Sequence, residues 1–318
     1  MGPSDELRGW RVMRQDVEFL SGGEVVRGHL YLPEGDGPFP LVVMAGGWCY
    51  VKELVQPYYA QAFVDAGCAA VVFDYRRFGA SDGTPRQHLD PWDQIEDYRN
   101  AISFGETLGR VDAGRIGVWG ISYSGGHALI VGATDPRVRC VVSTIPVVDG
   151  LLNMKRVHGA IGFRRLVDAV GEDRRKRFST GEYGYIPMSS ANYAGEVVTW
   201  PFPEVTSVFE GLQKSEAPAH EHRNTVASVE LLMNYTVFPY VERLLNTPTL
   251  MIVAEGDDIT LWEEEIDAFN RIPSAKKRLF VVDHTTHMVL YSNRSQLEIA
   301  ADQGARWFAE HLVTPYAH

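Results

Sequence analysis

Two serines of the chain stand in or near the pattern Gly-x-Ser-x-Gly, which presents a nucleophilic hydroxyl on a tight turn. The stretch GASDG around Ser81 has the complete pattern, whereas GISYS around Ser122 has a serine in place of the last glycine. A serine hydroxyl attacks an acyl carbonyl efficiently only when a nearby base accepts its proton and a carboxylate orients that base. The elements around each serine therefore decide which of them could perform this chemistry.

The residues around Ser122 predict the strand–turn–helix setting that a nucleophile on a turn requires. RIGVWG (115–120) has the apolar character of a strand, GGHALIVGA continues as a helix, and small residues stand two positions before and after the serine. Around Ser81 the preceding strand ends at Asp74, and the following DGTPRQHLDP contains two prolines, which indicate a loop. We predict Ser122 as the nucleophile and Ser81 as a structural loop residue. A tight turn without chemistry is the alternative for Ser122.

Candidates for the orienting acid and for the base follow two later strands. Asp257 and Asp258 come directly after the apolar run TLMIVA, and His284 and His287 follow LFVV. In an open α/β sheet, residues at the carboxyl ends of the strands gather at one edge, and the chain order Ser, Asp, His is typical of such a site. We predict Asp257 as the acid and His287 as the base. His287 is preferred because it lies further along its loop and can reach back to Ser122. Each of these residues taken singly could be a surface loop residue.

A tetrahedral intermediate also needs two backbone N–H donors for its oxyanion. The amide of Tyr123 is one candidate, since it follows the serine at the start of the predicted helix. The amide of Trp48 is the other, in the loop MAGGWCYVKE, where Gly46 and Gly47 allow the backbone to approach closely. An ordinary turn is the alternative interpretation of the two glycines.

Short apolar runs alternate with helix-period segments over most of the chain. The runs are PLVVMA (40–45), CAAVVFD (68–74), RIGVWG (115–120), RCVVST (139–144), TPTLMIV (247–253) and KRLFVV (277–282). Such runs are typical of strands buried on both faces of a parallel sheet, and SGG (21–23) between alternating residues indicates an N-terminal hairpin. The sequence therefore predicts an α/β fold with a doubly wound, mostly parallel eight-stranded sheet.

The alternation stops between about residues 150 and 238, which have no comparable strand runs. We predict a core in two parts, 1–149 and 239–318, separated by a helical cap over residues 150–238. Its segment 155–177 contains eight basic and three acidic residues, a local charge of +5. This charge indicates either a site for an acidic group or a solvated helix face. Aromatic residues of the cap are interpreted either as the lining of an acyl pocket or as packing within the cap. They are Tyr183, Tyr185, Tyr193, Trp200, Phe202 and Phe209.

Composition excludes several classes of function. The net charge of −11 argues against nonspecific nucleic-acid binding, which needs a basic surface. No apolar run approaches the roughly 18 residues that span a bilayer, and MGPSDELRGWRVMRQDV lacks the apolar centre of a secretory signal, so we expect a cytoplasmic protein without membrane association. The three scattered cysteines, and the lack of any dinucleotide or phosphate-loop motif, predict no metal and no cofactor. HTTH (284–287) and HEH (220–222) lack further ligands at a recognised metal spacing.

These motifs together resemble the α/β-hydrolase superfamily, in particular the branch of dienelactone hydrolases and X-Pro dipeptidyl-peptidase-like esterases. VVMAGGWCYVKE is similar to the oxyanion loop of that branch, although Gly46 stands where many members have histidine. WGISYSGGHAL is similar to its nucleophile turn, in which serine commonly replaces the last glycine. The resemblance also aligns Asp257 in LMIVAEGDDIT with the acid and His287 in DHTTHMVLY with the base.

The sequence therefore predicts a serine hydrolase that cleaves a carboxylic ester or thioester of a small-molecule acyl substrate through an acyl-enzyme. The resemblance includes acyltransferases of polyketide pathways, so transfer of the acyl group in secondary metabolism is one alternative, and hydrolysis of a carbon–carbon bond at the same site is another. From a different class, a ligand-binding module on a hydrolase fold is a further alternative, because fold alone does not fix function. A homodimer is left open.

Overall fold

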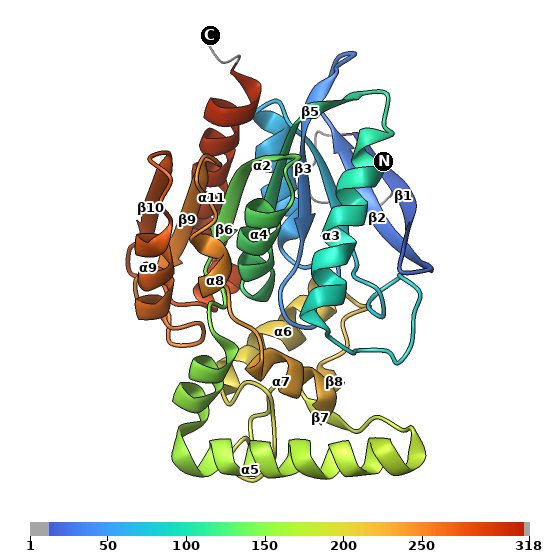
Figure 1. Ribbon diagram of the computed structural model, residues 1–318, viewed down its shortest axis with the longest axis vertical. Coiled ribbons are helices and arrows are strands. Elements are labelled where there is room, and N and C mark those ends of the chain that lie inside the picture. Colours follow the sequence, from blue (N-terminus) through green and yellow to red (C-terminus); the bar gives the residue numbers. More distant parts are fainter. Residues whose placement is uncertain (1–12, 315–318) are drawn as a thin grey trace.

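The computed structural model describes residues 13–314 (Figure 1). The strands of its main sheet are β1 (Met13–Ser21), β2 (Glu24–Leu32), β3 (Phe39–Ala45), β4 (Ala69–Phe73), β5 (Val111–Ile121), β6 (Val138–Thr144), β9 (Thr249–Ala254) and β10 (Lys277–Val282). Within the described residues these eight strands lie in the order β1-β2-β4-β3-β5-β6-β9-β10. β2 runs antiparallel to β1 and β4, and all other neighbours are parallel. The predicted doubly wound, mostly parallel eight-stranded sheet is confirmed.

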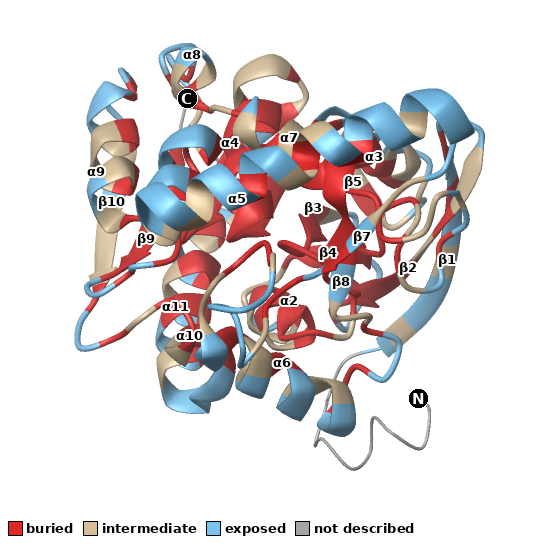
Figure 2. Ribbon diagram, turned by 90° about the horizontal axis from the view of Figure 1, so that it is seen from below, coloured by how far each residue is buried: buried red, intermediate tan, exposed pale blue. Residues whose placement is uncertain are grey.

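The central strands are apolar along their length because helices cover both faces of the sheet. Every residue of β4 and of β9 is buried. Helices α2 (Gln56–Asp65) and α11 (Arg294–Phe308) pack on one face, and α3 (Pro91–Glu106), α4 (Tyr123–Thr134) and α9 (Trp262–Arg271) pack on the other. The buried residues fill the space between these layers, and the outward helix faces are exposed (Figure 2).

Two short elements at the C-terminal side complete the core. α10 (Val289–Ser292) follows the loop that contains His287, and a π-helical turn (Ala309–Val313) extends α11. Among the described helices, none combines the length and the apolar character needed to cross a bilayer. Most of the N-terminal segment on which the expectation of a cytoplasmic protein rests lies outside the described residues.

Between β6 and β9 the chain leaves the sheet and forms a separate layer, which we call the insertion (residues 150–235). Its elements are α5 (Gly150–Thr180), β7 (Tyr185–Pro187), α6 (Pro203–Ser215), β8 (Arg223–Thr225) and α7 (Val226–Met233), and α8 (Phe238–Val241) leads back to the core. α5 runs along the end of the sheet at which the chain leaves β5 and β6 (Figure 1). It is interrupted at Gly159, whose φ of 60° breaks the helical geometry.

The insertion is not wholly helical, because β7 and β8 pair as a two-stranded antiparallel sheet. Strands of three residues are too short to give an alternating pattern, so the sequence does not predict them. The two ends of the insertion lie side by side, since the Gly150 N–H donates to the Tyr235 carbonyl at 2.9 Å and the Val237 N–H donates to the Val148 carbonyl at 2.8 Å.

Candidate active site

Ser122 occupies the turn between β5 and α4 in a conformation that non-glycine residues rarely adopt, with φ 58° and ψ −122°. Such strain persists only where the surroundings fix it, and here the Ser122 N–H donates to the Thr144 carbonyl at 2.9 Å. Gly120 permits the turn because a Cβ at that position would overlap the carbonyl of Ser124. The Ser124 hydroxyl donates to the Ala45 carbonyl at 2.8 Å, so the serine that replaces the last glycine of the pattern ties β3 to the turn.

A continuous chain of hydrogen-bonding groups joins Ser122 to His287 and Asp257. Nε2 of His287 lies 3.2 Å from Oγ of Ser122, and Nδ1 of the same ring lies 2.7 Å from Oδ2 of Asp257. The other carboxylate oxygen, Oδ1, accepts the N–H groups of Ile259 at 3.0 Å and Thr260 at 2.9 Å. Both carboxylate oxygens therefore accept hydrogen bonds. Because Asp257 accepts from Nδ1–H of His287, Nε2 of the same ring carries no proton and can accept one from the serine hydroxyl.

The alternative acid and base lie outside this arrangement. Asp258 is exposed. The His284 side chain is 94% exposed, with Nδ1 3.6 Å from the carboxylate of Glu255. Asp257 and His287, in contrast, are each 3% exposed. The structure therefore brings Ser122, Asp257 and His287 together, and it leaves the two neighbouring residues in solvent.

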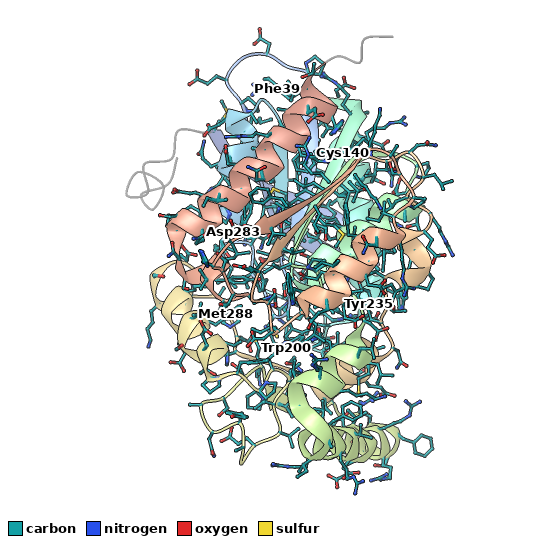
Figure 3. The ribbon with its side chains drawn as sticks, turned by 90° about the vertical axis from the view of Figure 1, so that its left-hand side faces the viewer. Phe39, Cys140, Trp200, Tyr235, Asp283 and Met288 are labelled. Atoms are coloured by element: carbon teal, nitrogen blue, oxygen red, sulfur yellow. The ribbon has the colours of Figure 1, made fainter. Side chains whose placement is uncertain are left out.

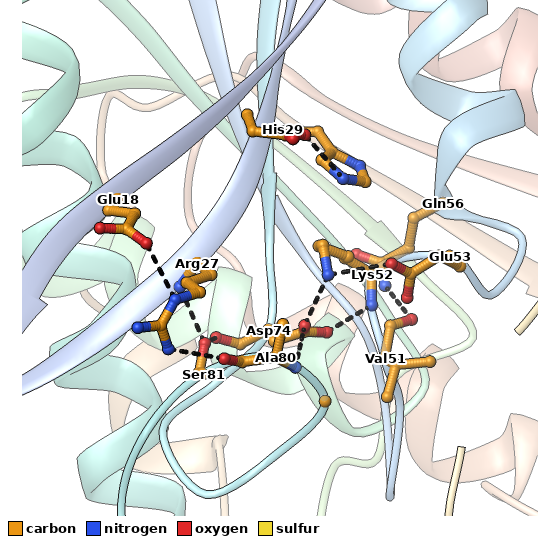
Figure 4. Close-up of polar contacts among 12 residues, drawn as sticks. Glu18, Arg27, His29, Val51, Lys52, Glu53, Gln56, Asp74, Ala80 and Ser81 are labelled. Atoms are coloured by element: carbon orange, nitrogen blue, oxygen red, sulfur yellow. Dashed lines mark hydrogen bonds and ion pairs between the residues drawn. The ribbon is translucent and has the colours of Figure 1, made fainter. Parts of the chain in front are cut away.

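Ser81 has the complete glycine pattern but serves as a buried structural hydroxyl. It donates to the Asp74 carbonyl at 2.7 Å and accepts the Arg27 N–H at 2.9 Å (Figure 4). The Asp74 carboxylate in turn binds the Lys52 ammonium at 2.9 Å and the Ala80 N–H at 2.9 Å. These contacts hold the loop after β4, and Ser81 has no histidine as a hydrogen-bond partner among the described residues.

The two predicted oxyanion donors are the backbone N–H groups of Trp48 and Tyr123, and both lie in segments that come close to Ser122. Within the described residues, neither the Trp48 N–H nor the Tyr123 N–H donates a hydrogen bond, so both are free for a ligand. Gly47 brings the first loop close, because a Cβ on it would lie 3.0 Å from Cβ of Ser122 and 3.4 Å from N of Tyr123. The Trp48 and Tyr123 rings pack with their centroids 5.0 Å apart. A larger residue than glycine at position 47 would crowd this approach.

A small apolar cavity lies over the serine. Core and insertion both line it, through Trp48, Tyr50, Ser122, Met188, Trp200, Val205, Phe209, Ile259, His287, Met288 and Tyr291. Its volume of about 20 Å³ holds about one water molecule. Trp200 and Met288 lie at the boundary between core and insertion (Figure 3). Of the aromatic residues predicted for an acyl pocket, Trp200 and Phe209 line the cavity.

The other aromatic residues of that set, and the basic residues of segment 155–177, do not line the cavity. Tyr193 is 44% exposed and Tyr185 is 39% exposed. Four of the eight basic residues of segment 155–177 form ion pairs with nearby carboxylates, which are Arg156 with Glu263, Arg174 and Arg177 with Glu230, and Lys176 with Glu182. Much of the local positive charge is therefore balanced within the chain.

Two side chains beside the acid and base carry no signal of their own in the sequence. The Thr260 hydroxyl lies 3.2 Å from Nδ1 of His287 and donates to Oε1 of Glu265 at 3.0 Å. Glu265 is completely buried, and burial raises the pKa of its carboxyl well above the ordinary value, with a further contribution from the charge of Asp257. Glu265 is the last of three consecutive glutamates at the start of α9, a run that by itself indicates a solvated helix face.

Metal-binding side chains do not cluster in this region. In residues 13–314 no group of three or more His, Cys, Asp or Glu side chains could hold a metal ion. His220 and His222 instead bond to each other, with Nε2 and Nδ1 3.4 Å apart.

The chain is similar to known proteins in both sequence and structure. Residues 22–289 match the sequence profile of the X-Pro dipeptidyl-peptidase (S15 family). The chain is 31% identical over 308 residues to the thiohydrolase aneE of Aspergillus aculeatus, with 95% of each chain covered. It is 27% identical over 273 residues to the acyltransferase drtE of Aspergillus calidoustus, covering 84% of this chain and 85% of the relative. The crystal structure of the α/β hydrolase GrgF from Penicillium sp. sh18 aligns with a TM-score of 0.79 at 21% identity, over 95% of this chain and 100% of that one.

The strand order, the turn after β5 and these similarities define an α/β-hydrolase enzyme. The chain belongs to the X-Pro dipeptidyl-peptidase (S15) family. The relatives' names include both hydrolases and acyltransferases, so the family fixes the type of enzyme more closely than the acceptor of the acyl group.

Proposed function

We propose that the protein is a serine hydrolase that cleaves an ester or thioester of an apolar acyl group. The observation that carries this proposal is the buried chain Ser122–His287–Asp257, with contacts of 3.2 and 2.7 Å, at the base of an apolar cavity. The cavity lining favours an apolar acyl group, because side chains such as Trp48, Trp200 and Phe209 offer few polar partners. The similarity to the thiohydrolase aneE supports a thioester as the bond cleaved.

In the proposed mechanism, Oγ of Ser122 attacks the acyl carbonyl while Nε2 of His287 accepts the hydroxyl proton. Asp257 holds the ring with Nδ1 protonated and stabilises the imidazolium that forms. The N–H groups of Trp48 and Tyr123 donate to the oxyanion of the tetrahedral intermediate. The intermediate collapses to an acyl-serine, and the departing thiol or alcohol receives its proton from His287. Water activated by the same imidazole then releases the acid and restores Ser122.

Acyl transfer is the second candidate function, and the small apolar cavity favours it. Room for about one water molecule, surrounded by apolar side chains, limits competition by bulk water for the acyl-enzyme. The similarity to the acyltransferase drtE also supports this alternative. An acceptor alcohol or amine would then take the place of water, with His287 as its base.

Fluorophosphonate labelling followed by peptide mass spectrometry tests the proposal. We expect the label on Ser122 and a large loss of labelling in the His287→Ala variant. Ester and thioester substrates with acyl chains of increasing length, assayed with and without added alcohols, separate hydrolysis from transfer by the ratio of free acid to new ester. A label on Ser81, or none on Ser122 in the active protein, would overturn the assignment.

A further inference from the structure

The insertion binds the loop that carries Trp48 through three hydrogen bonds from one short stretch around β8. We call this stretch the β8 clasp (residues 220–224). The three bonds join Nδ1 of His220 to the Cys49 carbonyl at 3.0 Å, Sγ of Cys49 to the Arg223 carbonyl at 3.3 Å, and Nε1 of Trp48 to Oδ1 of Asn224 at 3.0 Å. Residues 176 positions apart are thereby joined at the edge of the candidate active site.

Asn224 is held in one orientation within the clasp. Its side chain is completely buried. Oδ1 also accepts the Thr199 hydroxyl at 2.8 Å, and Nδ2 donates to the Thr225 carbonyl at 3.0 Å. The Trp48 indole can only donate, so the amide oxygen must face it. The contact between Asn224 and Trp48 is therefore fixed in geometry as well as in chemistry.

The residue after Trp48 has a strained backbone. Cys49 has a φ of 59°, in the left-handed region that favours glycine. Strain of this kind persists only where surrounding contacts fix the conformation. The carbonyl and the thiol of Cys49 bond to the clasp. Burial lowers the pKa of His220 to about 4, so a neutral His220 ring donates Nδ1–H to the Cys49 carbonyl. The clasp is thus the element that keeps this loop in its strained form.

We propose that Asn224 is a positioning residue. By holding the indole ring of Trp48, it keeps the backbone N–H of Trp48 directed at the oxyanion of the tetrahedral intermediate. This inference rests on the proposed function. It gives the insertion two roles, since the same segment that supplies Trp200 and Phe209 to the roof of the cavity also completes the oxyanion site. Because the insertion supplies both part of the cavity lining and the acceptor for the Trp48 indole, seating of the insertion and assembly of the oxyanion site are coupled.

The variant Asn224→Leu tests the inference, because it keeps the size of the side chain and removes the acceptor. We expect kcat for a reactive ester to fall about 10–100-fold, somewhat less than the loss of a whole oxyanion donor, while KM changes less than about threefold. Asn224→Asp is expected to keep most of the kcat that Asn224→Leu loses, since a buried, protonated carboxyl offers the same acceptor and donor. Thr199→Val is the matched control, because it removes a different hydrogen bond to Oδ1 and leaves the Trp48 bond intact, and its kcat is expected to stay within about threefold of the parent.

A double-mutant cycle with Trp48→Phe shows whether Asn224 acts through the indole. Since Trp48→Phe removes the indole N–H that bonds to Asn224, we expect Asn224→Leu to have little further effect on kcat in the Trp48→Phe background. Additive losses, or an unchanged kcat in Asn224→Leu while turnover still depends on Ser122, would overturn this inference alone. Turnover that survives Ser122→Ala would overturn the proposed function. If Asn224→Leu does not fold, Trp48→Phe carries the test alone, with a lowered kcat expected and an unchanged kcat contradicting the inference.

Discussion

Oγ of Ser122 lies 3.2 Å from Nε2 of His287, although 165 positions separate the two residues in the chain. Ser122 follows β5 and His287 follows β10, and these strands end at the same edge of the sheet. The insertion lies between them in the sequence but contributes no strand to the main sheet. Their contact therefore depends on the sheet, and each partner can be tested separately from the insertion.

Replacing each of the two patterned serines gives opposite results. Ser122→Ala removes the proposed nucleophile and is expected to lower kcat by about 10⁶-fold, to the residual rate given by binding and the oxyanion donors. Ser81→Ala is expected to keep kcat within about twofold and to reduce the free energy of unfolding by about 1–3 kcal/mol, because the partly buried Arg27 N–H loses its acceptor. Steady-state kinetics and urea unfolding measure the two effects. The reverse pattern would mean that the wrong serine has been assigned.

Asp257→Asn is expected to lower kcat by about 10⁴-fold with little change in KM. The amide oxygen of asparagine would face the N–H groups of Ile259 and Thr260, which now donate to Oδ1 of Asp257. Its NH₂ group would then face Nδ1 of His287 and favour the tautomer with the proton on Nε2, which cannot accept the serine proton. Asp258→Asn is the control, because that exposed side chain is expected to leave kcat unchanged. Equal effects of the two variants would contradict the assignment of the acid.

Gly47→Ala is expected to lower kcat by about 10–100-fold while the protein stays folded. The new Cβ would lie 3.0 Å from both the Ile121 carbonyl oxygen and Cβ of Ser122, so the loop must shift away from the turn that holds the nucleophile. Gly211→Ala in α6 serves as the control, since its Cβ would meet nothing within 4 Å. Circular dichroism establishes folding, and initial rates with one ester give kcat. A fully active Gly47→Ala enzyme would argue against an oxyanion site in this loop.

Glu265→Gln is expected to change how stability depends on pH. Burial raises the pKa of the Glu265 carboxyl, so the folded protein keeps a proton that the unfolded chain releases above its ordinary pKa of 4.5. This contribution to stability is complete at acidic pH and is lost as the pH rises from there towards the raised pKa. Glu265→Gln keeps an acceptor for Thr260 and removes the proton, which makes the slope of unfolding free energy against pH less negative by up to about 1.4 kcal/mol per unit.

Urea titrations between pH 5 and about pH 8 measure that slope. Glu263→Gln is the control, because its side chain is 60% exposed and its replacement should leave the slope as it is. Parallel curves for the parent and Glu265→Gln would mean that this carboxyl is ionised in the folded protein.

The sequence predicts the parts of the molecule whose burial leaves a pattern. β4 and β9 are buried on both faces, so they appear as uninterrupted apolar runs, and the positions of Ser122, Asp257 and His287 follow from the ends of such runs. The complete glycine pattern around Ser81 is misleading by itself, and the absence of a following helix is what distinguishes it.

Residues that act through distant contacts leave no such pattern. Asn224 lies in a strand of three residues, and its partner Trp48 is 176 positions away, so nothing near Asn224 in the sequence indicates a role. Glu265 is the last of three consecutive glutamates at the start of α9, and such a run by itself indicates exposure to solvent. Pairing in three dimensions, which no local periodicity encodes, determines the contacts of both.

The two ends of the insertion lie side by side, and this arrangement has an evolutionary consequence. Because Gly150 bonds to Tyr235 and Val148 to Val237, the chain leaves the core and returns to it at neighbouring points. A descendant gene can therefore lengthen, shorten or exchange the stretch between these points while β6 and β9 keep their register. Such a change would alter the part of the cavity lining that the insertion supplies and leave the strands before Ser122, Asp257 and His287 in place, provided that the new stretch again offers an acceptor to the Trp48 indole.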